Sequence, residues 1–238
     1  MQEHTVKAYD DELNRLRSII SQMAGFAEAQ LDGSVDSLIQ RDAEGARRIM
    51  AADAKLDQLD MDAEKLAIEI MARRAPMADD LREIVAALKI STMLERIGDY
   101  AKNIAKRATV LSGTTPISLA SIIPRMAIDA KSMIKDALDA LIERDTARAV
   151  DVWHRDKRID DLYNSLFREL LTYMMENPRL ITPCTHLLFV AKNIERIGDQ
   201  ATNIAEITYY AIEGEMMKES RPKGDETSFT YVEPADEV

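Results

Sequence analysis

Residues 95–105 read ERIGDYAKNIA, and residues 195–205 read ERIGDQATNIA. Nine of these eleven positions are identical, and they include an acid, an amide and a glycine that an ordinary helix does not need at fixed places. The two stretches begin 100 positions apart in a chain of 238 residues. This spacing predicts a tandem repeat of two similar halves, each long enough to form a core.

The composition is that of an all-helical, acidic protein. Aromatic residues make up 5% of the chain, which contains only 8 glycines and 7 prolines, so we expect almost no strand. The net charge is −11 at pH 7. This argues against sequence-independent binding of nucleic acid, because such binding requires Lys and Arg to neutralise the phosphates. The charge suits cations or basic partner surfaces instead.

Several features predict a cytoplasmic protein. The first residues do not read as a signal peptide, and apolar runs such as residues 187–191 are far too short to span a bilayer. The single cysteine, Cys184, excludes an internal disulfide and a cysteine-based zinc site. We interpret Cys184 as a buried small hydrophobe.

Apolar residues recur every three or four positions, which predicts amphipathic helices. Helices are expected at residues 5–40, 42–74 and 77–111 in the first half, and at residues 117–143, 146–176 and 179–213 in the second. Asp42 is a candidate N-cap, and turns are expected at Pro76 and Asn177-Pro178. Short connections predict two tandem antiparallel three-helix bundles related by internal pseudo-symmetry.

Three segments are expected along the chain. Residues 1–112 form the first bundle, residues 113–214 the second, and residues 215–238 a polar tail. Residues 112–116 are the best linker candidate because they combine a glycine, a proline and small polar residues. The tail has few apolar residues to bury, so we expect it to be disordered.

The apolar residues that recur every three or four positions form a row along each helix that faces the core, which we call the apolar seam. Acidic residues lie beside this seam at matched positions of both halves. The seam directs Leu94 and Ile97 inward, which leaves the acids of the motif on the outer side, and the preceding helix carries a second acid pair. Asn103 and Asn203 are further candidate oxygen ligands. The candidate metal ligands are Asp53, Asp57, Glu95 and Asp99 in the first half, and Asp156, Asp160, Glu195 and Asp199 in the second.

A helical hairpin brings together residues that are equally far from its turn. Asp57 and Glu95 lie equally far from Pro76 along the sequence. Asp53 and Asp99 are also equally far from Pro76. In the second half, Asp160 and Glu195 are equally far from the Asn177-Pro178 turn, and so are Asp156 and Asp199. Four carboxylates should therefore lie at one level of each hairpin, roughly 28 Å from the turn at about 1.5 Å per residue.

A bound cation would relieve the repulsion within these groups. Like charges one turn apart destabilise a helix by roughly 0.2–0.5 kcal/mol per pair. Clustered carboxylates suit iron or zinc, with manganese, magnesium or calcium as alternatives. Gly98 and Gly198 indicate close approach, coordination space or a packing constraint, since a mid-helix glycine costs about 1 kcal/mol relative to alanine. The competing interpretation is that all eight acids form a solvated face.

The sequence offers no catalytic constellation. There is no glycine-rich phosphate loop, and no Ser-His-Asp or Cys-His arrangement can be placed. Asp151 and His154 resemble one element of a di-iron bundle, but the first half lacks a matching histidine. We therefore expect a protein that is not an enzyme.

The doubled motif, together with the acid pairs on the preceding helices, resembles the PhoU family of bacterial phosphate-transport regulators. The resemblance covers roughly residues 5–213. It implies two three-helix bundles whose surface acid pairs hold metal clusters, and the family pattern falls on the eight acids named above.

The resemblance also implies a function. PhoU proteins restrain the phosphate-starvation response when phosphate is plentiful, and are thought to link the ATPase of the phosphate-specific ABC transporter to a sensor histidine kinase. They commonly form homodimers. The chain is accordingly expected to be a negative regulator of phosphate uptake that acts through protein contacts.

Two other hypotheses remain open. A ferritin-like carboxylate metalloprotein for storage or oxidation would need inward-facing ligands and matched histidines, whereas the seam places these acids outside. A metal-free helical adaptor would use the acids as a docking face for basic partners.

Overall fold

The chain folds almost entirely into α-helices. A computed structural model describes residues 2–114, 117, 122–218, 221, 224 and 227. The first half contains α1 (Gln2–Gln40), α2 (Ala43–Ala52), α3 (Ala54–Arg74) and α4 (Asp79–Leu111). The second half contains α5 (Ile122–Glu143), α6 (Thr146–Glu176), the 3-10 helix η2 (Pro178–Leu180) and α7 (Ile181–Glu213). No strand occurs in these described ranges, which confirms the all-α prediction.

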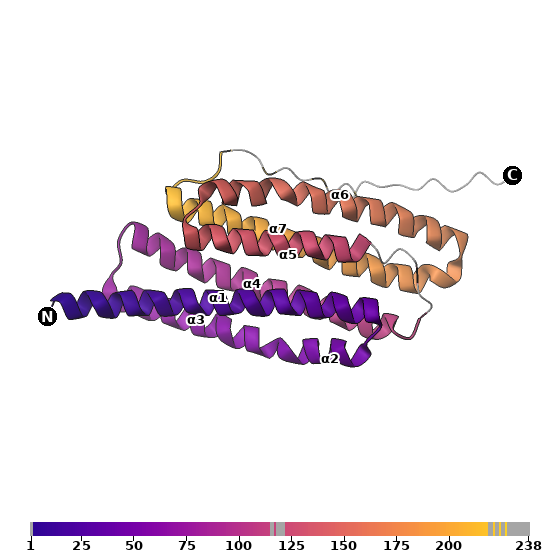
Figure 1. Cartoon of the computed structure of the whole chain (residues 1–238), viewed down its shortest axis with the longest axis horizontal. Coiled ribbons are helices and arrows are strands. Elements are labelled where there is room, and N and C mark those ends of the chain that lie inside the picture. The colour runs from indigo at the N-terminus through magenta and orange to yellow at the C-terminus, as the bar shows by residue number, and fades with distance from the viewer. Residues whose placement is uncertain are drawn as a thin grey trace.

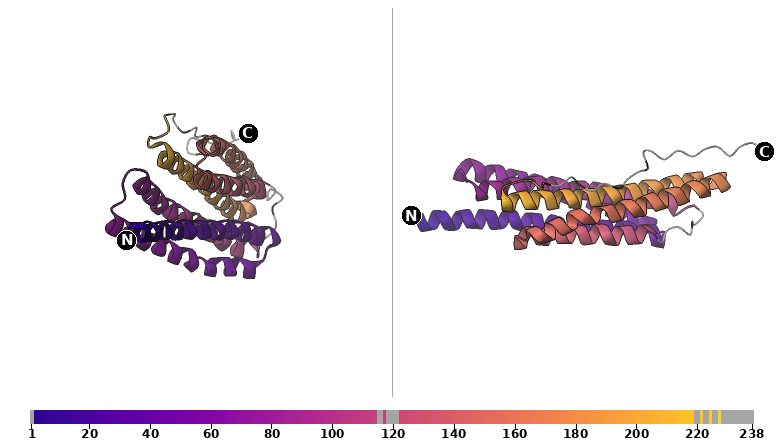
Figure 2. Two further views of the ribbon diagram at one scale, coloured as in Figure 1. Left: turned by 60° about the vertical axis from the view of Figure 1, so that its left-hand side comes forward. Right: turned by 90° about the horizontal axis from the view of Figure 1, so that it is seen from above.

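The helices form two bundles that lie side by side (Figure 1). In the first bundle α1, α3 and α4 pack against one another, and in the second α5 and α6 pack against α7. The bundles meet mainly through α4 and α7, with a further contact between α1 and α5. Turned views show the same two groups of lengthwise helices (Figure 2). The two motif-bearing helices therefore lie at the centre of the molecule.

The seam predicted from the sequence forms the core. Leu94, Ile97 and Ile104 of α4 have no exposed surface, and neither do Ile194 and Ile197 of α7. Burying a side chain of this size stabilises the fold by about 1.5–3 kcal/mol relative to leaving it in water. This packing fixes the two central helices and thereby positions the polar residues of the motif.

Matched N-caps begin the second predicted helix of each half. The Asp42 carboxylate accepts a hydrogen bond from the Gly45 amide at 2.9 Å, as predicted. Asp145 accepts one from the Arg148 amide at 3.0 Å at the corresponding place in the second half. A cap of this kind contributes about 1 kcal/mol to helix stability.

One predicted helix is interrupted. The sequence indicates a continuous helix over residues 42–74, whereas the structure divides it at Asp53 into α2 and α3. Asp53 keeps helical φ and ψ angles of −57° and −40°, but its side chain makes no capping hydrogen bond to α3. It pairs instead with Lys102 on α4. The apolar positions of the seam continue on both sides of Asp53, so the sequence pattern gives no sign of the break.

The two halves join between α4 and α5. α5 begins at Ile122, later than the predicted helix start at residue 117, where the chain is not helical. Residues 115, 116 and 118–121, which include part of the predicted linker, lie outside the described residues. The domain boundaries at residues 112 and 214 stay predictions.

Burial and helix composition bear on two further expectations. Cys184 is fully buried, as predicted, and burial raises the pKa of its thiol. Within the described ranges, no helix is both long enough and apolar enough to cross a membrane.

Two acid clusters as candidate functional sites

The first acid cluster consists of Asp53, Asp57, Glu95 and Asp99, beside the start of α3 and in the middle of α4. Burial raises the pKa of Glu95, and the charges of Asp99 and Asp57 raise it further. The pKa of Asp57 is raised by burial and then by the charge of Asp53. The carboxylates therefore lie close enough to interact electrostatically, as the hairpin geometry predicts. Their role as metal ligands stays a prediction.

Lys102 neutralises part of the first acid cluster. Its ammonium donates to Asp53 and lies 3.7 Å from a carboxylate oxygen of Asp99, one turn earlier on α4. The hydrogen bond to Asp53 raises the pKa of Lys102. Lys102 is not among the predicted site residues, although a lysine three positions after an acid on one helix is a recognisable pairing signal.

The second acid cluster consists of Asp156 and Asp160 on α6 and of Glu195 and Asp199 on α7. Burial raises the pKa of Glu195 to about 7, even though the Lys192 ammonium lies 3.0 Å from its Oε1 atom. The other oxygen, Oε2, is buried and has no hydrogen-bond partner among the described residues. A buried carboxylate that has an oxygen without a hydrogen-bond partner is energetically unfavourable in its charged form. An added cation would stabilise the charged form.

Two residues of the C-terminal tail contact the second acid cluster. The Arg221 guanidinium donates to Asp156 through Nε at 3.0 Å and through Nη2 at 2.8 Å, and Nη2 also donates to Asp199. The Gly224 amide donates to Asp160 at 2.7 Å. At these two residues the tail makes polar contacts rather than apolar ones, and the expectation that the tail is disordered stays a prediction.

Four of the eight acids are buried, which contradicts the expectation that the seam leaves these acids on the outer side and also counts against the competing interpretation of a solvated face. Asp53, Asp156, Asp160 and Glu195 are 3%, 2%, 3% and 6% exposed, respectively. They flank the seam, and a position next to the seam is covered where the facing helix lies close. Asp57, by contrast, is exposed. The clusters thus lie at helix–helix junctions.

The glycines of the motif permit this close approach. A Cβ atom on Gly98 would lie 2.4 Å from a Leu56 methyl carbon and 2.7 Å from the Gln30 side-chain oxygen. A Cβ atom on Gly198 would lie 2.8 Å from an Ile159 methyl carbon. The nearest cluster oxygens are farther away, at 3.5 Å and 3.7 Å. Packing is therefore the first reason for both glycines.

The donor chemistry of both clusters fits a hard divalent cation, since carboxylate oxygens are its usual ligands. As the side chains stand, no group of three or more His, Cys, Asp or Glu residues in the described chain could hold a metal ion. Lys102 and Arg221 occupy oxygens that such an ion would need. Of the two candidate amides, Asn203 lies 3.5 Å from Arg221, and Asn103 is exposed.

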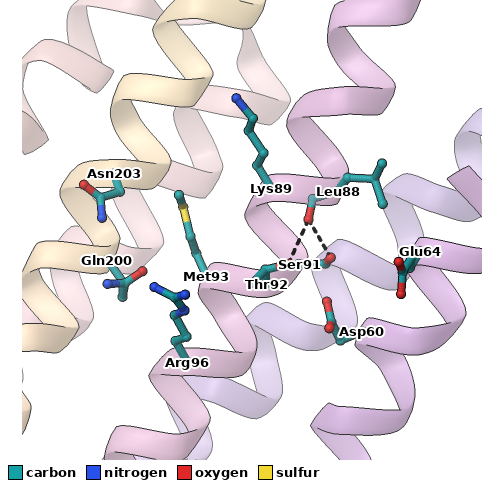
Figure 3. Close-up of a pocket in the computed structure, with 10 residues that line it drawn as sticks. All are labelled: Asp60, Glu64, Leu88, Lys89, Ser91, Thr92, Met93, Arg96, Gln200 and Asn203. Atoms are coloured by element: carbon teal, nitrogen blue, oxygen red, sulfur yellow. Dashed lines mark hydrogen bonds between the residues drawn. The ribbon is translucent and has the colours of Figure 1, made fainter.

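A pocket of about 490 Å³ lies over α4, with α7 on one side and α3 on the other (Figure 3). Figure 3 shows Arg96 directed from α4 toward Gln200 and Asn203 on α7. Asp60 and Glu64 on α3 line its other side. The pocket brings motif residues of both halves together, and its wall carries charges of both signs.

Comparison with known proteins assigns the chain to a family. A family model described as the PhoU domain matches residues 20–108 and 123–208. The phosphate-specific transport system accessory protein PhoU homolog of Caulobacter vibrioides is 50% identical over 94% of this chain and 98% of that protein. The homolog of Zymomonas mobilis is 47% identical over 91% of each chain. The crystal structure of PhoU from Pseudomonas aeruginosa matches with a TM-score of 0.83 and 35% identity, over 87% of this chain and 100% of that one. By sequence and by fold, this chain belongs to the PhoU family.

Proposed function

We propose that this protein is a negative regulator of phosphate uptake and of the phosphate-starvation response. The observation that carries the proposal is its near full-length similarity to proteins named accessory proteins of the phosphate-specific transport system. An accessory role favours a protein that is not an enzyme and acts through contacts with other proteins.

The proposed partners are the ATPase of the phosphate-specific ABC transporter and the sensor histidine kinase of the phosphate two-component system. The protein would meet both in the cytoplasm, as a homodimer. Its net charge of −11 supports contact with basic surfaces on these partners.

A reporter driven by a phosphate-starvation promoter tests the regulatory role. Deletion of the gene should leave the reporter active at high phosphate, and the full chain supplied in trans should restore repression. A deletion strain whose reporter still responds normally to phosphate would contradict the proposal.

The acid clusters are proposed to bind divalent metal ions, with iron or zinc first and manganese, magnesium or calcium as alternatives. The four carboxylates of each cluster would hold the ions, whose charge would neutralise them. Support comes from the donor chemistry and from the buried Glu195 oxygen, which has no hydrogen-bond partner within the described part of the chain. Binding would require Lys102 and Arg221 to withdraw from the carboxylates.

Elemental analysis of natively purified protein tests metal binding. The parent should contain metal, and a variant with Asp57→Ala, Glu95→Ala, Asp160→Ala and Glu195→Ala should contain little while staying helical by circular dichroism. A matched control should retain metal because it changes four exposed acids outside the clusters: Glu44→Ala, Asp62→Ala, Glu143→Ala and Glu176→Ala.

A metal-free helical adaptor is the second candidate. The observation in its favour is that Lys102 and Arg221 already pair with the cluster acids. Absence of metal from both the parent and the four-acid cluster variant, after purification without chelator and attempted reloading, would favour this candidate. The acids would then serve as a pairing surface for basic groups.

A further inference from the structure

The two acid clusters are neutralised by different segments of the chain. In the first cluster, Lys102 of α4 pairs with Asp53. The repeat position on α7 is Thr202, whose hydroxyl lies 3.3 Å from Asp156 but carries no charge. The positive charge beside Asp156 comes instead from Arg221, beyond the end of α7.

Arg221 makes a bridging contact within the second cluster. Its side chain is 15% exposed, and it joins Asp156, which is 3% exposed, to Asp199, which is 27% exposed. A guanidinium presents five donors in a rigid fork, so one group can satisfy two carboxylates. The contact therefore covers oxygens on both helices of the hairpin.

A second contact holds the backbone of the same segment, which we name the C-terminal arm (described at residues 215–218, 221, 224 and 227). The Gly224 amide donates to Asp160 at 2.7 Å, and the Asn164 side chain donates to the Gly224 carbonyl at 2.6 Å. A Cβ atom on Gly224 would lie only 3.2 Å from the Asp160 Cβ. The arm thus engages three of the four acids in the second cluster.

We propose that the C-terminal arm competes with divalent cations for the second acid cluster, so that a docked arm and a bound ion exclude each other. The proposal rests on the metal binding proposed above, because arm and ion need the same oxygens of Asp156 and Asp199. At the first cluster, the Lys102 side chain is 38% exposed and can turn into water while its helix stays in place. The first cluster therefore fills at lower cation concentration, and filling of the second releases the arm.

Mn²⁺ titration calorimetry on the metal-stripped full chain tests the competition. Arg221→Gln should tighten the weaker class of sites by at least about tenfold, since it removes charge-assisted hydrogen bonds of the competitor. Lys218→Gln is the matched control, because Lys218 is a cation of the same arm that pairs with Glu215 at 3.4 Å and is 82% exposed. The control should match the wild type, and equal affinity in Arg221→Gln and wild type would overturn the proposal.

Hydrogen–deuterium exchange with mass spectrometry follows the arm itself. In metal-free protein, peptides that contain the Gly224 amide should exchange more slowly in the wild type than in Arg221→Gln. Saturating Mn²⁺ should raise the wild-type rate to that of the variant. An arm whose exchange changes neither with the substitution nor with bound Mn²⁺ would overturn the proposal.

The results of these experiments distinguish failure of the competition from failure of the proposed function. Mn²⁺ bound at both clusters with an unaffected arm overturns the competition alone. Mn²⁺ bound at neither cluster in any variant overturns the competition and the metal part of the proposed function together. The regulatory part is decided independently by the promoter reporter.

Discussion

At the residue scale, Gly98 connects helix packing with the first acid cluster. In Gly98→Ala the new methyl group overlaps Leu56 and Gln30, which should cost about 1–3 kcal/mol. The gain of about 1 kcal/mol in helix propensity offsets part of this cost, so we predict a net destabilisation of up to about 2 kcal/mol. Urea denaturation measures the difference.

A second glycine supplies the control for this prediction. A Cβ atom on Gly25 of α1 would meet nothing within 4 Å. Gly25→Ala should therefore show only the propensity gain, up to about 1 kcal/mol of added stability. If Gly98→Ala is as stable as Gly25→Ala, the close helix contact is not what requires the glycine.

Lys102 provides a second prediction at this scale. In chelator, Lys102→Met should lower the free energy of unfolding by about 1–2 kcal/mol, because Asp53 stays buried without its partner. The loss is small because water already screens the charge of Lys102, which is 38% exposed. Added Mn²⁺ should restore stability by binding the native state. Lys106→Met, at an exposed position on the same helix, should leave the metal-free free energy within about 0.5 kcal/mol.

Sequence patterns located the acids more readily than their basic partners. Periodicity and hairpin symmetry identify which acids share a level, because both depend only on residue numbers. Lys102 reaches Asp53 across 49 positions, through the length of a flexible side chain. Whether Lys102 can reach Asp53 depends on the distance between α3 and α4. The spacing of residues in the sequence does not give this distance.

At the scale of helices, the apolar seam predicted most elements and concealed one break. The cap at Asp42 follows from local chemistry and is confirmed. The interruption at Asp53 has no such local signal, and the Asp53 side chain pairs with another helix. Local rules therefore predict where a helix begins better than where it is interrupted.

A contact between α4 and α7 makes stability depend on pH. Arg107 donates to the Nδ1 atom of His186 at 3.2 Å, so this nitrogen must be unprotonated. Burial and the charge of Arg107 lower the pKa of His186 from its ordinary value of 6.5. The neutral ring is therefore favoured in the folded state. Its contribution to stability is present above pH 6.5 and is lost as the pH falls.

We predict that His186→Gln loses less stability than the wild type between about pH 7.5 and about pH 5.5, because glutamine does not take up a proton. Denaturant midpoints at the two pH values measure the loss. His154→Gln changes an exposed histidine on α6 and should behave like the wild type. Equal losses in all three proteins would contradict the prediction.

At the scale of the whole molecule, each bundle covers part of the other. α4 contacts α7, and α1 contacts α5. We predict that a fragment of residues 1–114 alone has a lower denaturation midpoint than the full chain and associates with a separate fragment of residues 115–238. Size-exclusion chromatography and circular dichroism of the fragments, alone and mixed, measure this. Fragments that are fully stable and stay apart would indicate independent domains.

The C-terminal arm marks the limit of what one sequence predicts at this scale. Its composition includes few apolar residues, which predicts that it has no core of its own. Arg221, however, finds its partner Asp156 across 65 positions, by charge rather than by periodicity. A single basic residue in a polar segment carries no pattern that distinguishes such a contact.

Cys184 makes this chain convenient for site-specific labelling. It is the only cysteine, it is fully buried, and burial raises its thiol pKa. Maleimides react with exposed thiolates, so at neutral pH the native chain should remain almost unlabelled. A cysteine introduced at Thr227 would then carry a fluorophore without any need to replace Cys184. Its emission would follow movements of the C-terminal arm in real time in an otherwise natural sequence.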